Sequence, residues 1–345
     1  MIKQLRVGTF NLFNLVLPNT KYYDKREYSL GKYKKKARWI NEQLKKMRAD
    51  IVGFQEIFHE EAIKGLLSRN SAYKEAHVIT TPPSGKKPVV GLLSKFPIKN
   101  YEVITDFPEK IDLLDDEEES TDHIIPLQKF SRPVLRAEIA LADDFIISVF
   151  VIHLKSKRPV YPNGIDEHNP IEKSKGQLRA LIKRASEANA IRQIFIKHRL
   201  EYPDYPVVVL GDLNDSGGAV TTNLIAGERP WVHKPTGVKF KDWMELKKMS
   251  WSVLLHNCKN IQARQSFKDL YYTHIYNGHH ECLDHILVSN EFADSNKNRI
   301  GRVMNIQVFN DHLIDETLSG DAVPIWQSDH GQVVASIEFD RLDDE

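Results

Sequence analysis

Two short polar runs constrain most strongly what this chain can fold into. Residues 211–215 directly follow an apolar, β-branched run, which predicts a buried strand that ends at Asp212 and Asn214. Residues 328–330 contain Asp329 and His330 and lead into another such strand at residues 333–337. Ligands of α/β proteins bind where strands end. Carboxylates, an amide and an imidazole at such ends therefore predict a site for phosphate-ester chemistry at a sheet edge.

Further predicted strands end or begin with polar residues and complete a pattern. In chain order these residues are Asn11, Glu56, His153 and Asp284. With the two runs above, the order is Asn, Glu, His, Asp-x-Asn, Asp, Asp-His. This order resembles the endonuclease/exonuclease/phosphatase superfamily, which has the DNase I-like fold, over nearly the whole chain from Arg6 to Phe339. Six motifs in one order are far more specific than any single tripeptide.

The remaining periodicity predicts an α/β protein. Apolar residues at helical spacing mark residues 32–47, 59–67 and 175–200, and the apolar stripe of the last helix should lie on a sheet. Residues 134–141 and 145–154 alternate as an antiparallel pair, whereas residues 155–173 should form a polar loop. The resemblance implies a four-layer α/β sandwich, with two mixed sheets packed face to face and helices outside. Because no repeat or linker interrupts residues 1–345, we expect one domain and a monomer.

The amino-acid composition says more about possible binding partners than about the activity. The chain has 48 basic and 47 acidic residues, so nucleic-acid binding would need a local patch. Its two cysteines, Cys258 and Cys282, are expected to be free thiols. The acidic run at residues 115–119 should be a solvated loop. We expect no membrane span, and a cytoplasmic protein, or a secreted one if the sequence is a processed mature form.

The predicted metal ligands are oxygen donors. The resemblance places Glu56 in the main metal site with Asn11 and Asp329 nearby. It gives Asp212 the task of aligning or deprotonating water or holding a second metal. Asn214 is expected to donate a hydrogen bond to phosphate and is also counted among the metal ligands. Oxygen ligands favour Mg²⁺ or Mn²⁺ over Zn²⁺, with Ca²⁺ as a further ion. Taken alone, Asp212 and Asn214 would instead indicate an Asx turn.

Two histidines complete the predicted catalytic set. His330 and Asp284 resemble the family's imidazole–carboxylate pair, in which the carboxylate orients a ring that acts on water or phosphate. His153 resembles the second active-site histidine of the DNase I branch, although a histidine at a strand end also serves structural roles. His285 should point to the opposite face of its strand and is expected in the core or behind the site.

Several cations are expected to contact substrate. Arg132 resembles a family arginine that binds substrate phosphate; an ordinary surface salt bridge is the alternative. Lys155, Lys157 and Arg158 follow His153, and the run His-x-Lys-Ser-Lys resembles the motif of bacterial secreted and membrane-attached nucleases of this superfamily. Contacts of this kind hold backbone phosphates without reading sequence. A solvated charged loop is the alternative.

These features support a metal-dependent phosphodiesterase that cleaves DNA or RNA by in-line attack of water, with little sequence preference. Hydrolysis of small or lipid phosphoesters, as in the inositol-phosphatase and sphingomyelinase branches, is the alternative. A catalytically inactive binding module is disfavoured because every metal and catalytic position holds a competent residue. The sequence leaves the substrate, the endo or exo mode and the number of metals open.

Overall fold

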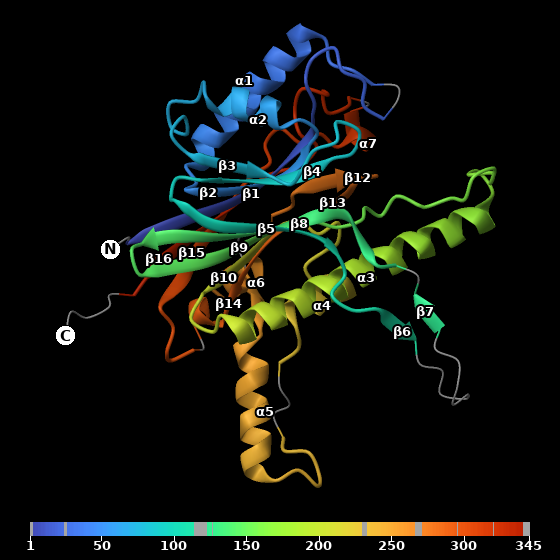
Figure 1. Ribbon diagram of the computed structural model, residues 1–345. Coiled ribbons are helices and arrows are strands. Elements are labelled where there is room, and N and C mark those ends of the chain that lie inside the picture. The colour runs from blue at the N-terminus through green and yellow to red at the C-terminus, as the bar shows by residue number, and fades with distance from the viewer. Residues whose placement is uncertain are drawn as a thin grey trace.

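Two six-stranded mixed sheets pack face to face, and helices cover both outer faces (Figure 1). This confirms the predicted four-layer α/β sandwich. The computed structural model describes residues 3–23, 26–113, 123–125, 127–229, 233–265, 271–294, 296–319 and 321–340. The acidic run at residues 115–119 lies outside the described residues.

The first sheet contains the N-terminal strand at its centre. Its order is β15-β16-β1-β2-β4-β3, and only the β1–β2 pair is parallel. Helices α1 and α2 cover its outer face through a buried cluster that includes Leu44 and Ile63. The bounds are β1 (Gln4–Leu15), α1 (Leu30–Met47), β2 (Ile51–Ile57), α2 (Glu60–Leu67), β3 (His77–Thr80), β4 (Val89–Ser94), β15 (Gly301–Phe309) and β16 (Gln332–Phe339).

The second sheet has the order β11-β14-β10-β9-β8-β5, with only β9 and β10 parallel. Its inner face packs on the first sheet through one apolar cluster that includes Val151, Leu210 and Ile286 beside Val7 and Ala335. This core joins the two sheets, so their polar strand ends lie in one region. The bounds are β5 (Ile98–Asp106), β8 (Lys129–Ala142), β9 (Phe145–His153), β10 (Val207–Asp212), β11 (Leu255–Asn257) and β14 (Asp284–Ser289).

The long helix α3 (Pro170–Glu201) crosses the outer face of the second sheet (Figure 1). The prediction that residues 155–173 form a loop is wrong at its end, because Pro170 occupies the first turn. Asn169 caps that turn by accepting hydrogen bonds from two backbone amides, and proline needs no amide partner there. The predicted apolar stripe packs on the sheet only around Ile191 and Phe195; Leu178 is 55% exposed.

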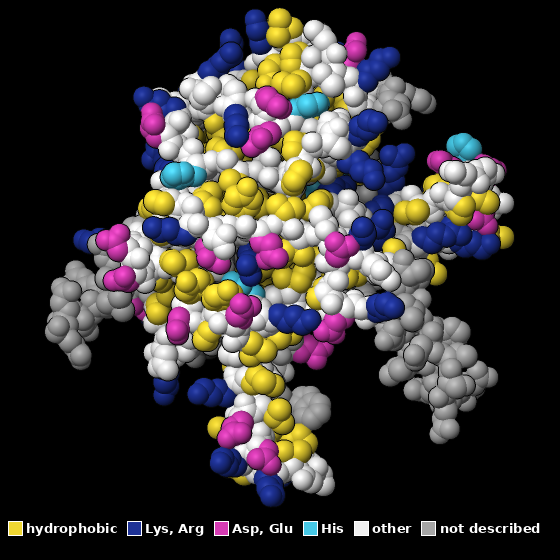
Figure 2. Space-filling view, in the orientation of Figure 1, with side chains coloured by type: hydrophobic (Ala, Val, Ile, Leu, Met, Phe, Trp, Pro, Cys, Tyr) yellow, Lys and Arg dark blue, Asp and Glu magenta, His cyan; other side chains and the backbone are white. Residues whose placement is uncertain are grey.

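Several smaller elements lie outside the two six-stranded sheets. A short hairpin, β6 with β7, lies on either side of the acidic run at residues 115–119. Helix α5 extends from the body, and its Phe240 and Met249 are 65% and 51% exposed (Figures 1 and 2). Cys258 and Cys282 are free, as predicted, and both are buried. The bounds are β6 (Ile111–Leu113), β7 (His123–Ile125), α4 (Val220–Ala226), α5 (Phe240–Ser252), α6 (Cys258–Gln265), β12 (His274–Tyr276), β13 (His279–Glu281), η1 (Asn290–Phe292) and α7 (Glu316–Ser319).

Candidate active site

The polar strand ends of the second sheet lie side by side. In the register of this sheet, Asp212 at the end of β10 pairs with His153 on β9 and with Asp284 on β14. Residues opposite one another on neighbouring strands share a face of the sheet. All three are buried. The sequence located each of them at a strand end, and strand pairing brings them together.

Gly211 permits this close approach. Its φ is 145°, and a Cβ atom there would lie 2.0 Å from the carbonyl oxygen of Ile152 on β9. Any side chain would force the two strands apart, so glycine is needed at the residue before Asp212. The glycine of the sequence motif therefore has a backbone role, and the chemistry belongs to its neighbours.

The carboxylate of Asp212 is the centre of the site. Its Oδ2 accepts a 3.1 Å hydrogen bond from Nδ2 of Asn11, which reaches across from the first sheet. The same oxygen lies 3.4 Å from Nε2 of His153 and 3.8 Å from Nε2 of His330. Oδ1 accepts a 2.8 Å hydrogen bond from the backbone amide of Asn214. Burial opposes ionisation, but the two imidazoles and the amide hold the pKa of Asp212 well below its usual range.

The two histidines at this carboxylate differ in charge. His330 places Nδ1 2.8 Å from Oδ2 of Asp284. Burial disfavours the imidazolium, but the Asp284 and Asp212 carboxylates outweigh it and raise the pKa of His330. Burial and the nearby charge of Arg132 lower the pKa of His153. A neutral and a protonated imidazole thus share one carboxylate, which is the kind of separation that acid–base chemistry uses.

Asn214 is fixed by contacts inside the protein. Its φ is 53°, a left-handed value that asparagine tolerates better than most residues. Its Nδ2 donates a 3.0 Å hydrogen bond to the carbonyl of Leu154 and so joins the motif loop to the end of β9. An amide nitrogen carries two N–H groups, so this contact leaves the predicted hydrogen bond to phosphate chemically feasible.

Glu56 also sits on strained backbone. Its φ is 64°, and Asn14, whose φ is 61°, donates its backbone N–H to Oε2 of Glu56 at 2.9 Å. Non-glycine residues in this conformation concentrate at functional sites, where the surrounding fold holds them. This geometry points the carboxylate towards the C-terminal end of β1.

Ser328 ties the two polar ends of the first sheet together. Its Oγ donates a 2.7 Å hydrogen bond to the carbonyl of Asn11 and accepts a 3.0 Å bond from the backbone amide of His330. The intervening Asp329 carries a buried Oδ1 without a hydrogen-bond partner among the described residues, and Oδ1 of Asp284 is in the same state. Buried carboxylate oxygens need a cation or ordered water.

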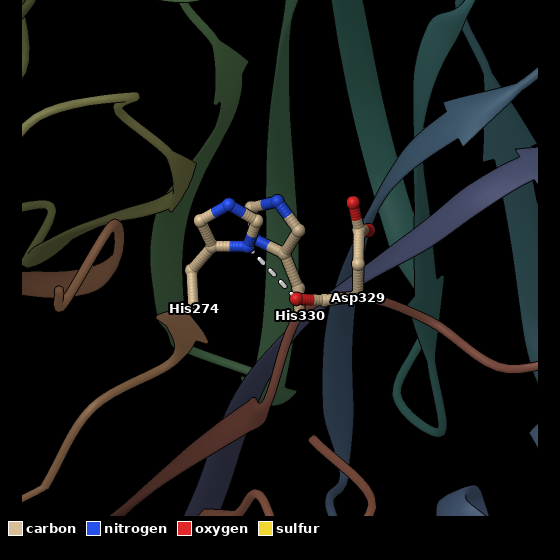
Figure 3. Close-up of side chains that lie close together, drawn as sticks. All are labelled: His274, Asp329 and His330. Atoms are coloured by element: carbon tan, nitrogen blue, oxygen red, sulfur yellow. Dashed lines mark hydrogen bonds between the residues drawn. The ribbon is translucent and has the colours of Figure 1, made fainter. Parts of the chain in front are cut away.

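These donors fit a divalent cation. Within the described residues, two groups bring three metal-type ligand atoms within 4.8 Å of one another: Asp212 with Asp284 and His330, and His274 with Asp329 and His330 (Figure 3). Glu56 belongs to neither group. The unpartnered oxygens of Asp284 and Asp329 match the ligand chemistry of hard ions such as Mg²⁺ and Mn²⁺.

A buried lysine that sequence reasoning missed lies beneath this region. Lys36 of α1 donates a 2.9 Å hydrogen bond to the carbonyl of Phe13 and a 3.4 Å bond to that of Ile325. Burial lowers the pKa of Lys36 to about 7, against the raising effect of the Glu56 and Asp329 charges. Lys36 thus joins the end of β1, the strand that carries Asn11, to the loop that leads to Asp329. Its helical position gave no signal, because lysines normally occupy the solvent side of such a helix.

Glu187 of α3 is a second missed residue. It is buried, and its carboxylate accepts hydrogen bonds from the backbone amides of Ser131 at 2.8 Å and Lys155 at 2.7 Å. Arg132, between these segments, donates a 2.9 Å bond to the carbonyl of Leu154. One glutamate therefore fixes both the predicted phosphate-binding arginine and the loop after His153.

The three predicted cations of that loop have different surroundings. Nζ of Lys155 donates 2.9 Å hydrogen bonds to the carbonyls of Ser156 and Arg158. Nζ of Lys157 lies 2.6 Å from Glu281. The side chains of Lys157 and Arg158 are exposed. Lys155 therefore shapes the loop, and the outer two cations remain near the surface.

His285 lies behind the site. Its Nε2 is 2.9 Å from the carbonyl oxygen of Asp215, and its Nδ1 is 3.0 Å from Nδ2 of Asn257. Burial lowers the pKa of this ring. A neutral imidazole that accepts from the amide and donates to the carbonyl satisfies both contacts. His285 thus supports the loop that carries Asn214.

The fold and the buried carboxylate–imidazole cluster define a phosphoesterase of the DNase I-like class. The model described as "Endonuclease/Exonuclease/phosphatase family" matches residues 8–330, so the chain belongs to this family. No curated protein sequence is significantly similar to it. No helix in the described part of the chain has the length and apolar character to cross a membrane.

Solved structures share the fold at low sequence identity. An endonuclease/exonuclease/phosphatase from Bacteroides vulgatus is 15% identical, with a TM-score of 0.54 and coverage of 98% of this chain and 99% of that one. TDP2 of D. rerio complexed with single strand DNA product is 13% identical, with a TM-score of 0.52 and coverage of 98% and 100%. An AP endonuclease from Archaeoglobus fulgidus is 16% identical, with a TM-score of 0.51 and coverage of 98% and 100%.

Proposed function

We propose that this protein is a divalent-metal-dependent phosphodiesterase that hydrolyses the backbone of DNA or RNA with little sequence preference. The observation that carries the proposal is the convergence of Asn11, His153 and His330 on the buried Asp212 carboxylate. Next to this cluster, Asp284 and Asp329 each present one carboxylate oxygen, Oδ1, that has no hydrogen-bond partner among the described residues. In-line hydrolysis of a phosphodiester needs such a set of groups around one phosphorus atom.

The charge of each residue decides its role in the proposed reaction. Asp212 accepts a hydrogen bond from the attacking water and aligns it, and its low pKa makes it a better orienting group than base. The neutral imidazole of His153 takes the proton of that water, and solvent protonates the leaving oxygen. The negative charges of Asp284 and Asp212 keep His330 protonated. Its imidazolium donates a hydrogen bond to a nonbridging phosphate oxygen and stabilises the negative charge that develops there. Asn11, Glu56 and Asp329 would hold the cation. A bound divalent ion supplies Lewis-acid stabilisation of the phosphoryl oxygens.

A polynucleotide substrate fits the basic groups beside this cluster. Arg132 donates a hydrogen bond to the carbonyl of Leu154, so its guanidinium lies beside the residue that follows His153. Lys157 and Arg158 are exposed in the loop that follows β9. The run from His153 to Lys157 also resembles the motif of the bacterial nuclease branch. Successive backbone phosphates would be held by these cations without contact to bases.

The test is a hydrolysis panel with Mg²⁺ and Mn²⁺ on duplex DNA, single-stranded DNA, RNA, phosphoinositide vesicles and bis-p-nitrophenyl phosphate. Wild type is compared with Asp212→Asn, which keeps the shape of the side chain but removes its charge. We expect metal-dependent cleavage of at least one polynucleotide by wild type and its loss in the variant. Activity that persists in excess chelator, or equal activity of both proteins, would overturn the proposal.

One observation favours the alternative substrate class. Helix α5 exposes apolar side chains, including Phe240, Met244 and Met249, next to Lys247 and Lys248 (Figure 2). Exposed apolar residues beside lysines are typical of helices that lie on anionic membranes. A lipid phosphoester would be the substrate if the vesicle lane alone is active and replacement of Phe240 and Met244 by serine abolishes vesicle binding but leaves chromogenic hydrolysis intact.

A further inference from the structure

A groove with a volume of about 400 Å³ lies between α1 and α2, outside the active site. Both helices cover the outer face of the first sheet (Figure 1). Four cations line this α1–α2 groove, and among its described lining residues only Glu42 is acidic. The cations are Lys34, Arg38 and Lys45 of α1 and Arg69, which follows α2. Because the whole chain has 48 basic and 47 acidic residues, this excess of positive charge is local.

Most of this positive charge is not neutralised within the protein. All four cations are exposed, and Figure 2 shows Lys and Arg side chains gathered over α1 at the top of the view. Nζ of Lys45 lies 3.0 Å from Oε1 of Glu42. In the part of the chain that the structure describes, Lys34, Arg38 and Arg69 form no ion pair. Three positive charges are therefore available to a ligand.

The row of cations also opposes the stability of the helix that carries it. Lys34 and Arg38 are four positions apart on α1, a spacing at which like charges repel. The first turn of α1 has no acidic residue, although the helix dipole favours one there. A solvated helix face gains no stability from this arrangement, whereas an anionic ligand in the groove offsets the repulsion.

The spacing of the cations requires an extended ligand. Lys34 and Lys45 are 11 positions apart on α1, which corresponds to about 16 Å along the helix axis. A single phosphate group cannot contact both ends of such a row. Successive phosphates of one strand of duplex DNA advance by about 3.4 Å along the axis, so the row matches about five of them. The groove therefore fits a polynucleotide backbone better than a mononucleotide.

The groove begins near the active site and leads away from it. Helix α2 starts four residues after Glu56, a predicted metal ligand. Near the start of both helices, Oη of Tyr33 donates a 3.4 Å hydrogen bond to the carbonyl of Ala62. Further along both helices, Nδ2 of Asn41 donates a 3.0 Å bond to the carbonyl of Leu66. The two helices thus run in the same direction, away from the sheet end that carries Glu56.

We propose that the α1–α2 groove binds the backbone phosphates of a polynucleotide on one side of the bond that is cleaved. The inference rests on the proposed function, because it takes the same strand to pass through the active site. The contacts are electrostatic, so they hold DNA or RNA without reading bases. They increase the affinity for long substrates and leave the chemical step unchanged.

Two paired substitutions test the groove. Arg38→Gln with Arg69→Gln removes one unpaired cation from each side of the groove and keeps a polar side chain there. Lys99→Gln with Lys297→Gln is the matched control, since both lysines are exposed and form no ion pair within the described residues but lie outside the groove. Binding to long duplex and single-stranded DNA is measured by fluorescence anisotropy in excess chelator over a range of salt concentrations. Urea unfolding checks that both variants are folded.

We expect the groove variant to bind DNA at least about fivefold more weakly at low salt. The slope of log affinity against log salt should decrease in magnitude by about 1 to 2, because two phosphate contacts are lost. Glu42→Gln removes the acidic lining residue and should instead strengthen binding, and the control pair should match wild type. In the groove variant, KM for a long polynucleotide should rise, while kcat and the turnover of bis-p-nitrophenyl phosphate stay unchanged.

Unchanged DNA affinity and salt slope in the groove variant, or an equal loss in the control pair, would overturn the groove proposal. The same holds if the groove variant loses only binding to phosphatidylserine vesicles, which would identify a membrane-binding surface. Hydrolysis by wild type separates the two proposals. Groove-dependent binding without metal-dependent cleavage of any polynucleotide refutes the proposed function alone, whereas cleavage with unchanged binding in the groove variant refutes the groove alone.

Discussion

The buried His198 predicts a loss of folding stability at acid pH, and the surroundings of its ring set the magnitude of that loss. This residue of α3 places Nδ1 3.0 Å from Nη1 of Arg136 and Nε2 2.8 Å from Oγ of Ser148. Arginine only donates, so Nδ1 is the acceptor and the ring is neutral. Burial, with the charges of Arg136 and Arg199, lowers the pKa of His198 to about 4. Protonation would set two donor groups against each other.

The unfolded chain lacks this environment, so the same imidazole titrates near 6.5 there. Between pH 6.5 and about 4, the unfolded state binds a proton that the folded state does not. Stability is therefore complete above pH 6.5 and falls as the pH falls through this window. The step from 6.5 to about 4 corresponds to about 3 kcal/mol in full, of which about 2 kcal/mol is lost by pH 5.

His198→Gln isolates this effect. The amide offers an acceptor to Arg136 and a donor to Ser148 but does not titrate. Urea unfolding, followed by tryptophan fluorescence and circular dichroism from about pH 7.5 to about pH 4.5, should show wild type losing about 2 kcal/mol more than the variant by pH 5. Parallel pH profiles would refute the assigned protonation. The comparison must precede any assignment of an acid limb in hydrolysis to His153 or His330, because unfolding also stops the reaction.

Three further results are expected. Asp212→Asn should lower kcat at least about a hundredfold with little change in KM, as steady-state kinetics on the chromogenic diester would show. Ser328→Ala should reduce the free energy of unfolding by about 1 to 3 kcal/mol, because it leaves a buried amide unsatisfied; an unchanged urea midpoint would contradict this. Joint replacement of Lys157 and Arg158 by alanine should weaken polynucleotide binding and flatten its salt dependence, while Lys3→Ala, at the opposite end of β1, should do neither.

Strand ends and apolar periodicity located most of the fold, because burial imposes a period on sequence. Apolar periodicity gives a wrong or no prediction where a helix is only partly buried. Residues at the start of α3 keep helical spacing but extend beyond the sheet, so Leu178 is exposed although its pattern predicts a packed face. Helix α5 was not predicted, since it has no buried residue to set a phase.

Prediction of the site residues is limited in the same way, because only residues that a sequence pattern marks can be found. Asp212, His153 and Asp284 could be found because each marks a strand end, and the register then aligns them. Lys36 and Glu187 could not, because they act through backbone carbonyls and amides that no sequence pattern identifies. His274 lies on a three-residue strand within a polar segment. Only its packing on His330 distinguishes it from the exposed histidines that follow.

The site depends on how the two sheets pack. Asp212 and His153 belong to one sheet. Asn11 belongs to the other sheet, His330 lies just before its strand β16, and the 3.1 Å hydrogen bond from Asn11 to Asp212 joins the two sheets. The apolar core between the sheets therefore sets the distance on which this bond depends. Sequence reasoning finds both halves but carries no measure of that distance. A core substitution far from the cluster should thus reduce activity before it unfolds the protein, because shifts of about 1 Å are sufficient to misplace catalytic groups.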